Sequence, residues 1–125
     1  MRLFLLLAVA ASAPTINVHA SRYGPVVFDG RGFALYAFTA DKPGRSTCFG
    51  ACAKAWPPFI VTRRPTGNPL LGVTRRRDGR LQVTLAGRPL YHYVGDRRPG
   101  QILCQNVPEF GGTWLVVRKD GTLVR

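Results

Sequence analysis

Short apolar runs separated by turn signals make up most of the chain after residue 20. The runs are rich in β-branched and aromatic residues, and Asp-Gly and other Gly-containing turns lie between them, which is typical of antiparallel strands. The pattern predicts three hairpins, with strands at 26–28 and 33–39, at 73–77 and 80–85, and at 114–118 and 122–124. Residues 86–89 turn the chain into one more strand at 90–94. We therefore expect an all-β domain of about seven or eight short strands.

One segment favours a helix instead of a strand. Ser46 is an acceptable N-cap for a helical turn over residues 46–55, and Trp56-Pro57-Pro58 would end that turn. The rest of the chain shows no long stripe of helical period. The sequence therefore predicts a single short helical turn within the β domain.

The chain also contains an internal repeat. Residues 35–41 (LYAFTAD) align with residues 90–96 (LYHYVGD), and the flanking Gly-Arg and Pro-Gly pairs align as well. Further on, Cys48 corresponds to Cys104 and Trp56 to Trp114. Both copies carry the signature Tyr-x-aromatic-x-x-Asp, formed by Tyr36, Phe38 and Asp41 in the first copy and by Tyr91, Tyr93 and Asp96 in the second.

The repeat predicts two tandem copies of one β unit, at about residues 23–61 and 73–124. The connection between them, residues 62–72, is rich in Arg, Pro and Gly. Two copies are too few for an open solenoid. We therefore expect them to pack on each other as a sandwich or a barrel-like arrangement, within one domain over residues 21–125.

The signature has a structural explanation and a chemical alternative. Period-two geometry places Tyr36 and Phe38 on one face of a strand, where aromatic side chains build a core or form a platform for a ligand. Asp41 and Asp96 follow the strand ends, where a carboxylate accepts hydrogen bonds from the backbone of the next turn. The alternative is that these two carboxylates form a general acid and base pair in one cleft.

The amino-terminal segment predicts export. Met1-Arg2 is followed by an apolar run over residues 3–11 that ends among small residues, which is typical of a secretory signal peptide. We expect cleavage after Ala20, because a cut after Ala13 would place Pro14 next to the cut. The apolar run is about half the roughly 20 residues that span a bilayer. We therefore expect residues 1–20 to be a signal peptide, and the mature chain to be periplasmic or secreted and not transmembrane.

The chain is strongly basic, with a formal net charge of +12 dominated by Arg. The charge suits a solubilising surface, or a contact for an anionic envelope polymer or lipid surface. Nucleic acid is not expected as a partner, because export separates the chain from it and no recognition motif accompanies the charge. The candidate contact residues are Arg63, Arg64, Arg75, Arg76, Arg77, Arg97 and Arg98.

Patterns for metals, cofactors and catalysis are weak. His92 is the one histidine after residue 20, and its counterpart in the first copy is Ala37. Cys-x3-Cys with a single His is poor spacing for zinc. The chain also lacks a Gly-x-Ser-x-Gly elbow for a serine nucleophile. We therefore expect no metal, no cofactor and no catalytic residue.

Three stretches resemble a known family. They are residues 28–41, with Asp-Gly-Arg-Gly leading into the signature, residues 48–58, with Cys-x3-Cys leading into Trp-Pro-Pro, and residues 110–114 (FGGTW). They are similar to the bacterial secreted-repeat proteins, often described as lipoproteins, whose function is unknown. The resemblance implies export and fold without an activity. The chain departs from the pattern because it has no lipid-anchor cysteine before Cys48, and because Cys104 and Asn106 replace a Gly-Gln-Gly-like segment.

The resemblance also implies a disulfide, because Cys48 and Cys52 both belong to the family's motif. Residues four apart in a regular helix do not bring their sulfurs to bonding distance, although Gly50 between them permits a broken turn. The alternative joins Cys48 to Cys104, at equivalent positions of the two copies. A thiol-redox role for these cysteines is a further alternative.

Together these observations predict an exported envelope or extracellular protein that acts as a non-enzymatic binding or structural module. Its biochemical activity stays unknown at this stage. The alternatives are a hydrolase-type enzyme that uses Asp41 and Asp96, and a thiol-redox protein.

Overall fold

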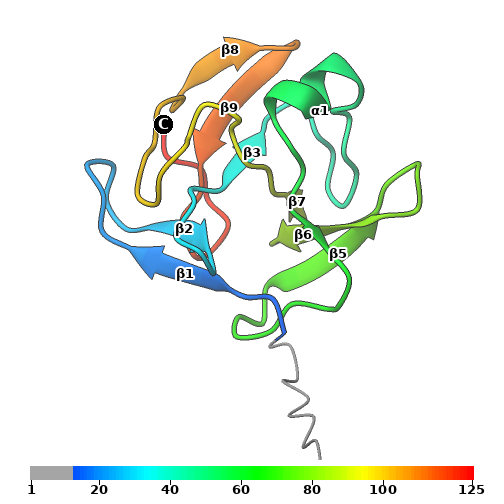
Figure 1. The fold of residues 1–125 in the computed structure, drawn as a ribbon, viewed down its shortest axis with the longest axis horizontal. Helices are drawn as coiled ribbons and strands as arrows, with labels where there is room; N and C mark the ends of the chain where they lie inside the picture. The colour runs from blue at the N-terminus through cyan, green and yellow to red at the C-terminus, as the bar shows by residue number, and fades with distance from the viewer. Residues whose placement is uncertain (1–12) are drawn as a thin grey trace, which may run out of the picture.

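The computed structural model describes residues 13–125, so the apolar run of the predicted signal peptide lies outside the described part. Within that part the chain forms nine short strands and one short helix (Figure 1). In chain order they are β1 (Ile16–His19), β2 (Val26–Asp29), β3 (Tyr36–Phe38), α1 (Ala51–Ala55), β4 (Ile60–Val61), β5 (Leu71–Arg75), β6 (Leu81–Leu85), β7 (Arg88–Pro89), β8 (Val107–Glu109) and β9 (Gly112–Val116).

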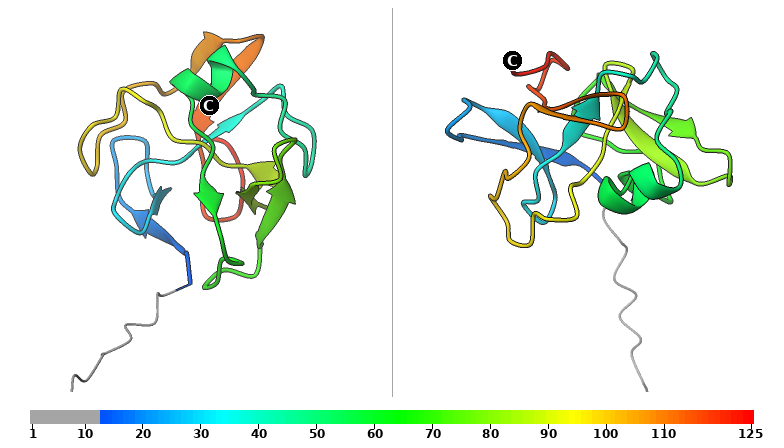
Figure 2. Two further views of the ribbon diagram at one scale, coloured as in Figure 1. Left: turned by 45° about the vertical axis from the view of Figure 1, so that its right-hand side comes forward. Right: turned by 90° about the horizontal axis from the view of Figure 1, so that it is seen from above.

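The strands form three small antiparallel sheets. β1 pairs with β2, β3 pairs with β9 and β9 with β8, and β6 pairs with β4, β5 and β7. The sheets surround a common centre, and none of them closes into a barrel within residues 13–125 (Figures 1 and 2). The expected all-β class with one short helix is confirmed.

The predicted hairpins are met to different degrees. β5 and β6 form the second hairpin, around a turn in which Gly79 has a φ of 86°, although the first strand begins and ends two residues earlier than expected. The third is present as a bridge between Val117 and Leu123. In the first, a single bridge joins Phe28 to Ala34, after which the chain departs to pair β3 with β9.

Two element boundaries differ from the expectation. α1 begins at Ala51 and not at Ser46, because Gly50 has a φ of 58° and the Ser46 hydroxyl accepts a hydrogen bond from the Cys48 N–H in its own turn. The strand expected at 90–94 is also wrong. Tyr91 forms only isolated bridges, and the later backbone donors of the segment go to the non-strand residues before β4, from His92 N to Pro57 O and from Val94 N to Ala55 O.

The two copies are related by a local twofold arrangement. Tyr36 N donates to Tyr91 O over 2.8 Å, and Tyr91 N donates to Tyr36 O over 2.9 Å. Other segments also pair across the copies. Val27 N of the first copy donates to Val117 O of the second, and Val83 N of the second copy donates to Phe59 O of the first, each over 2.9 Å. Each copy therefore completes a sheet of the other, and the copies interlock.

Two buried clusters lie on either side of these central strands. One is aromatic and contains Tyr36, Phe38 and Tyr91, and the other is aliphatic and contains Leu35 and Ala37. Alternate residues of β3 thus enter different clusters, as period-two geometry requires. All three residues of β3 are buried.

β1 precedes the expected cleavage site after Ala20. All of its residues pair with β2, Ile16 packs against the aliphatic cluster, and Pro14 O accepts a hydrogen bond from Thr66 N. Cleavage after Ala20 would therefore remove a strand of the domain, whereas cleavage after Ala13 would keep it.

A chain beginning at Pro14 should be more stable than a chain beginning at Ser21. Loss of β1 removes its ladder with β2 and the contacts of Ile16, which should lower the free energy of unfolding by roughly 2–4 kcal/mol. Urea unfolding of the two purified chains measures the difference. Mass spectrometry of the exported protein gives the natural cleavage site. Equal stability of the two chains would show that β1 is dispensable.

Candidate functional site

The two copies of the signature are joined to each other by their tyrosines and aspartates. The Tyr36 hydroxyl donates to Asp96 Oδ2 and the Tyr91 hydroxyl donates to Asp41 Oδ2, both over 2.6 Å. Because each tyrosine bonds the aspartate of the other copy, the signature forms a reciprocal tyrosine–aspartate brace.

The remaining carboxylate oxygens close the local turns. Asp41 Oδ1 accepts hydrogen bonds from the N–H and the hydroxyl of Thr47, at 2.8 and 2.9 Å. Asp96 Oδ1 accepts one from Leu103 N at 3.0 Å. The expected turn role of both aspartates is therefore present, and the bond between copies is an addition that the sequence did not indicate.

The aromatic residues of the signature meet at a stacked centre. The rings of Trp56 and Trp114 are parallel at 4.1 Å, and Phe38 stacks on the other face of Trp114 at 4.1 Å. Tyr93 lies 4.7 Å from Trp56, so the second aromatic of each copy contacts the tryptophan of the other. Both tryptophans and Tyr36 have 0% exposure. This aromatic set is therefore core and not an exposed platform, with Tyr93 partly buried at its edge.

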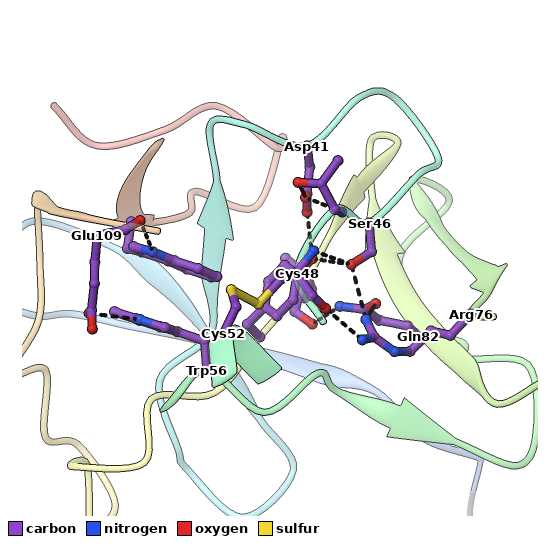
Figure 3. Close-up of a disulfide and its surroundings, with 12 residues drawn as sticks. Asp41, Ser46, Cys48, Cys52, Trp56, Arg76, Gln82 and Glu109 are labelled. Carbon is purple, nitrogen blue, oxygen red and sulfur yellow. Dashed lines mark hydrogen bonds between the residues drawn. A yellow bond between two sulfur atoms is a disulfide. The ribbon is translucent and has the colours of Figure 1, made fainter. Parts of the chain in front are cut away.

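A buried polar network extends from the brace toward the β5–β6 hairpin (Figure 3). Arg76 is 5% exposed and donates to Ser46 Oγ at 3.0 Å, to Gln82 Oε1 at 2.8 Å and to the Cys48 carbonyl at 2.6 Å. Ser46 Oγ is in turn 2.6 Å from the Tyr91 hydroxyl. Arg76 therefore corrects the expected surface set, because it is part of the interior.

Strand alternation could have revealed the position of Arg76. Arg75 and Arg77 are exposed on either side of it, so a continuation of the β5 period places the middle arginine inward. Its partners Ser46 and Gln82 carried no comparable signal. They come from distant segments of the chain.

Burial sets the protonation of the brace. Burial raises the pKa of Asp41 and of Asp96, and the hydrogen bonds from Tyr91 and Tyr36 oppose this only in part. Burial and the neighbouring aspartate raise the pKa of each tyrosine well above its ordinary value. Both tyrosines therefore act as neutral donors.

A second pair joins the copies through Asp29 and His92. His92 Nε2 lies 2.8 Å from Asp29 Oδ2, and Asp29 Oδ1 accepts hydrogen bonds from the backbone N–H groups of Arg31 and Phe33. Burial opposes ionisation of Asp29, but these hydrogen bonds outweigh it, and the pKa of Asp29 is lowered. Sequence reasoning noted that His92 does not recur but did not find its partner.

The disulfide joins Cys48 to Cys52, as the resemblance implies, with a Cα–Cα distance of 5.2 Å. The bond is possible because Cys48 lies before α1 and the turn at Gly50 breaks any regular helix between the two cysteines. Cys104 is a buried free thiol whose pKa is raised by burial. The alternative pairing of Cys48 with Cys104 is therefore wrong.

The exposed arginines do not form one surface. Arg75 and Arg77 lie by the β5–β6 turn, while the backbone N–H groups of Arg97 and Arg98 donate to Gln101 Oε1 in a separate turn. That turn, at residues 97–101, lies across the molecule from the β5–β6 hairpin (Figure 2). Arg63 and Arg64 are exposed in the connection between the copies.

Three exposed arginines gather around one hollow of about 470 Å³, which we call the cationic hollow. Arg77 lies over the ring of Phe49 at 4.2 Å, and buried Arg76 reaches the same ring at 4.7 Å. None of the residues that line this hollow in the described part of the chain is acidic. Its lining comprises Gly44, Arg45, Ser46 and Phe49 on one side and residues 74–77 on the other.

The two signature aspartates border different hollows. Asp41 lines one with Lys42 and Arg88, and Asp96 lines another with Arg31 and His92. Both oxygens of each carboxylate already accept hydrogen bonds. Within residues 13–125 the structure places no three His, Cys, Asp or Glu side chains together where they could hold a metal ion.

Comparison with known proteins identifies the repeat. A family model described as a secreted repeat of unknown function matches residues 18–60 and 72–124. No curated protein and no solved structure matches the chain. Among the described residues, no helix is long and apolar enough to cross a membrane.

Removing either brace hydroxyl should destabilise the fold. Tyr36→Phe and Tyr91→Phe each leave a carboxylate oxygen without its donor, which should lower the free energy of unfolding by about 1–3 kcal/mol. Tyr23→Phe is the matched control, because Tyr23 is only partly buried. Urea unfolding measures all three. An equal loss in the Tyr23 variant would contradict a specific role for the brace.

Asp29 and Asp96 should affect acid stability in opposite directions. The pKa of folded Asp29 is lowered, so its contribution to stability is present above the ordinary carboxyl pKa and is lost as the pH falls through the lowered value. The pKa of folded Asp96 is raised, so its contribution is complete below the ordinary pKa and is lost as the pH rises through the raised value.

Urea unfolding of Asp29→Asn and Asp96→Asn between about pH 2 and pH 6 separates the two effects. As the pH rises, the stability of the wild type should increase relative to Asp29→Asn and decrease relative to Asp96→Asn. Two profiles of the same slope would show that one of the assigned directions is wrong.

Proposed function

We propose that this protein, which belongs to the family of secreted repeats of unknown function, is a non-enzymatic module that binds an anionic polymer of the cell envelope through the cationic hollow. It would act in the periplasm or outside the cell, where its disulfide is stable. The proposal rests on a difference in charge between two equivalent hollows of the repeat.

The cationic hollow has a counterpart of similar size. Strand β5 begins 55 residues after β1, as Tyr91 follows Tyr36, so residues 74–77 correspond to residues 19–22. Residues 19–22 line a hollow of about 430 Å³ with Pro99, Gly100 and Ile102. The cationic hollow is lined by four arginines, whereas Arg22 is the one arginine among the described residues that line the equivalent hollow.

This difference supports a contact surface over a solubilising one. If the arginines served solubility alone, they would be expected at both equivalent positions and not at one of them. Clustered guanidinium groups in a concave, acid-free site raise the local concentration of anions and attract them strongly at low salt.

The frame around the hollow favours binding without large rearrangement. The disulfide fixes the segment that presents Phe49, and the Cys48 carbonyl anchors Arg76. Both carboxylates of the signature are committed to the brace, which supports a binding role over one in hydrolysis.

The proposal predicts salt-sensitive binding that depends on this hollow. Retention of the mature protein on an anionic envelope polymer should fall as ionic strength rises, because salt screens exposed charges. Arg45→Gln with Arg77→Gln should weaken binding about tenfold, the equivalent of one strong charged contact.

Arg97→Gln with Arg98→Gln is the matched control, because it removes the same net charge at the distant turn. Binding constants measured for both double variants in one buffer decide the point. Equal weakening would assign the binding to overall charge and not to the hollow. Retention that does not respond to salt would overturn the proposal.

A further inference from the structure

In the described part of the chain, the buried guanidinium of Arg76 donates hydrogen bonds to neutral groups only. Its hydrogen-bond acceptors are the Ser46 hydroxyl, the Gln82 amide and the Cys48 carbonyl. Its hydrogen bonds reach a carboxylate through Ser46 and Tyr91, at Asp41. Asp41 and Asp78 also interact with its charge through space. Within residues 13–125 no carboxylate forms an ion pair with this cation, which is 5% exposed, so part of its positive charge acts at the wall of the cationic hollow.

The same wall carries further donors for oxygen. Arg45, Arg75 and Arg77 are exposed around it and present guanidinium groups to the hollow. Guanidinium forks bind phosphate oxygens in pairs, and arginine clusters are the usual means of holding phosphate groups. We infer that the cationic hollow binds the phosphate ester groups of an anionic polymer, rather than its carboxylates. This inference rests on the proposed function.

Phe49 supports this specificity by orienting the guanidinium groups. Its ring lies within 5 Å of two of them, at 4.7 Å from Arg76 and 4.2 Å from Arg77. Stacking of this kind holds the plane of an arginine, whereas the ammonium of a lysine has no plane to hold. The recognition should therefore depend on guanidinium geometry as well as on charge.

The shape of the site favours a polymer over a bilayer as the source of the phosphate. The hollow is concave, and none of the large exposed apolar residues of the described chain lines it. These residues are Val18, Leu70, Val94, Leu103 and Phe110. A lipid surface would be expected to meet exposed apolar side chains beside the charges.

The test compares poly(glycerol phosphate) with poly-γ-glutamate of matched length and charge on the intact mature protein, by isothermal titration calorimetry. Poly(glycerol phosphate) should bind at least about tenfold more tightly. Arg45→Lys with Arg77→Lys keeps the charge and should weaken the binding of poly(glycerol phosphate) about tenfold, because a lysine ammonium lacks the guanidinium fork. Inorganic phosphate should compete better than acetate at equal ionic strength.

The outcomes separate the inference from the function on which it rests. If both polymers bind equally and Arg45→Gln with Arg77→Gln weakens both, the phosphate inference falls and the proposed function stands. If neither polymer binds, both fall. If phosphatidylglycerol vesicles bind more tightly than poly(glycerol phosphate), with the same dependence on Arg45 and Arg77, the polymer as source is overturned. Thermal unfolding confirms that each variant is folded.

Discussion

A phenolic hydroxyl buried away from water must find an acceptor, and in this protein the acceptor is supplied by the other copy of the repeat. Tyr36 reaches Asp96, and Tyr91 reaches Asp41. The backbone bonds between the two tyrosines lie at the same place, so polar and backbone pairing fix one arrangement of the copies. The tryptophan stack and the exchanged strands surround this point. A single copy would leave both the hydroxyl and the strand edges unpaired.

The brace and the tryptophan stack are built from residues that recur in both copies, so the remaining residues can serve different purposes in the two copies. Arg76 and Ser46 extend the brace on one side toward the cationic hollow. On the other side, Asp96 lies near the free thiol Cys104 and the pair formed by His92 and Asp29. The repeat therefore separates what holds the domain together from what distinguishes its two halves.

Local sequence patterns predicted much of the fold. Turn signals and period-two runs predicted the β5–β6 hairpin, and self-alignment predicted the two copies, because both are encoded by residues near each other or repeated. The exchange of strands was not predictable, since it depends on packing between segments far apart. The brace was missed for the same reason. The turn accounted for one carboxylate oxygen of each aspartate, and the sequence did not show that the other oxygen binds a tyrosine of the other copy. Arg76 was misplaced because a run of three arginines was treated as one surface.

The exchange of strands also bears on the time at which the protein can fold. Val27 in the first copy bonds to Val117, 90 residues later, which gives the domain many contacts between distant parts of the chain. High contact order slows folding, and the first copy has no complete partner until the last strand is present. A chain exported in an extended state would thus stay unfolded, and able to pass through a translocation channel, until almost all of it had emerged.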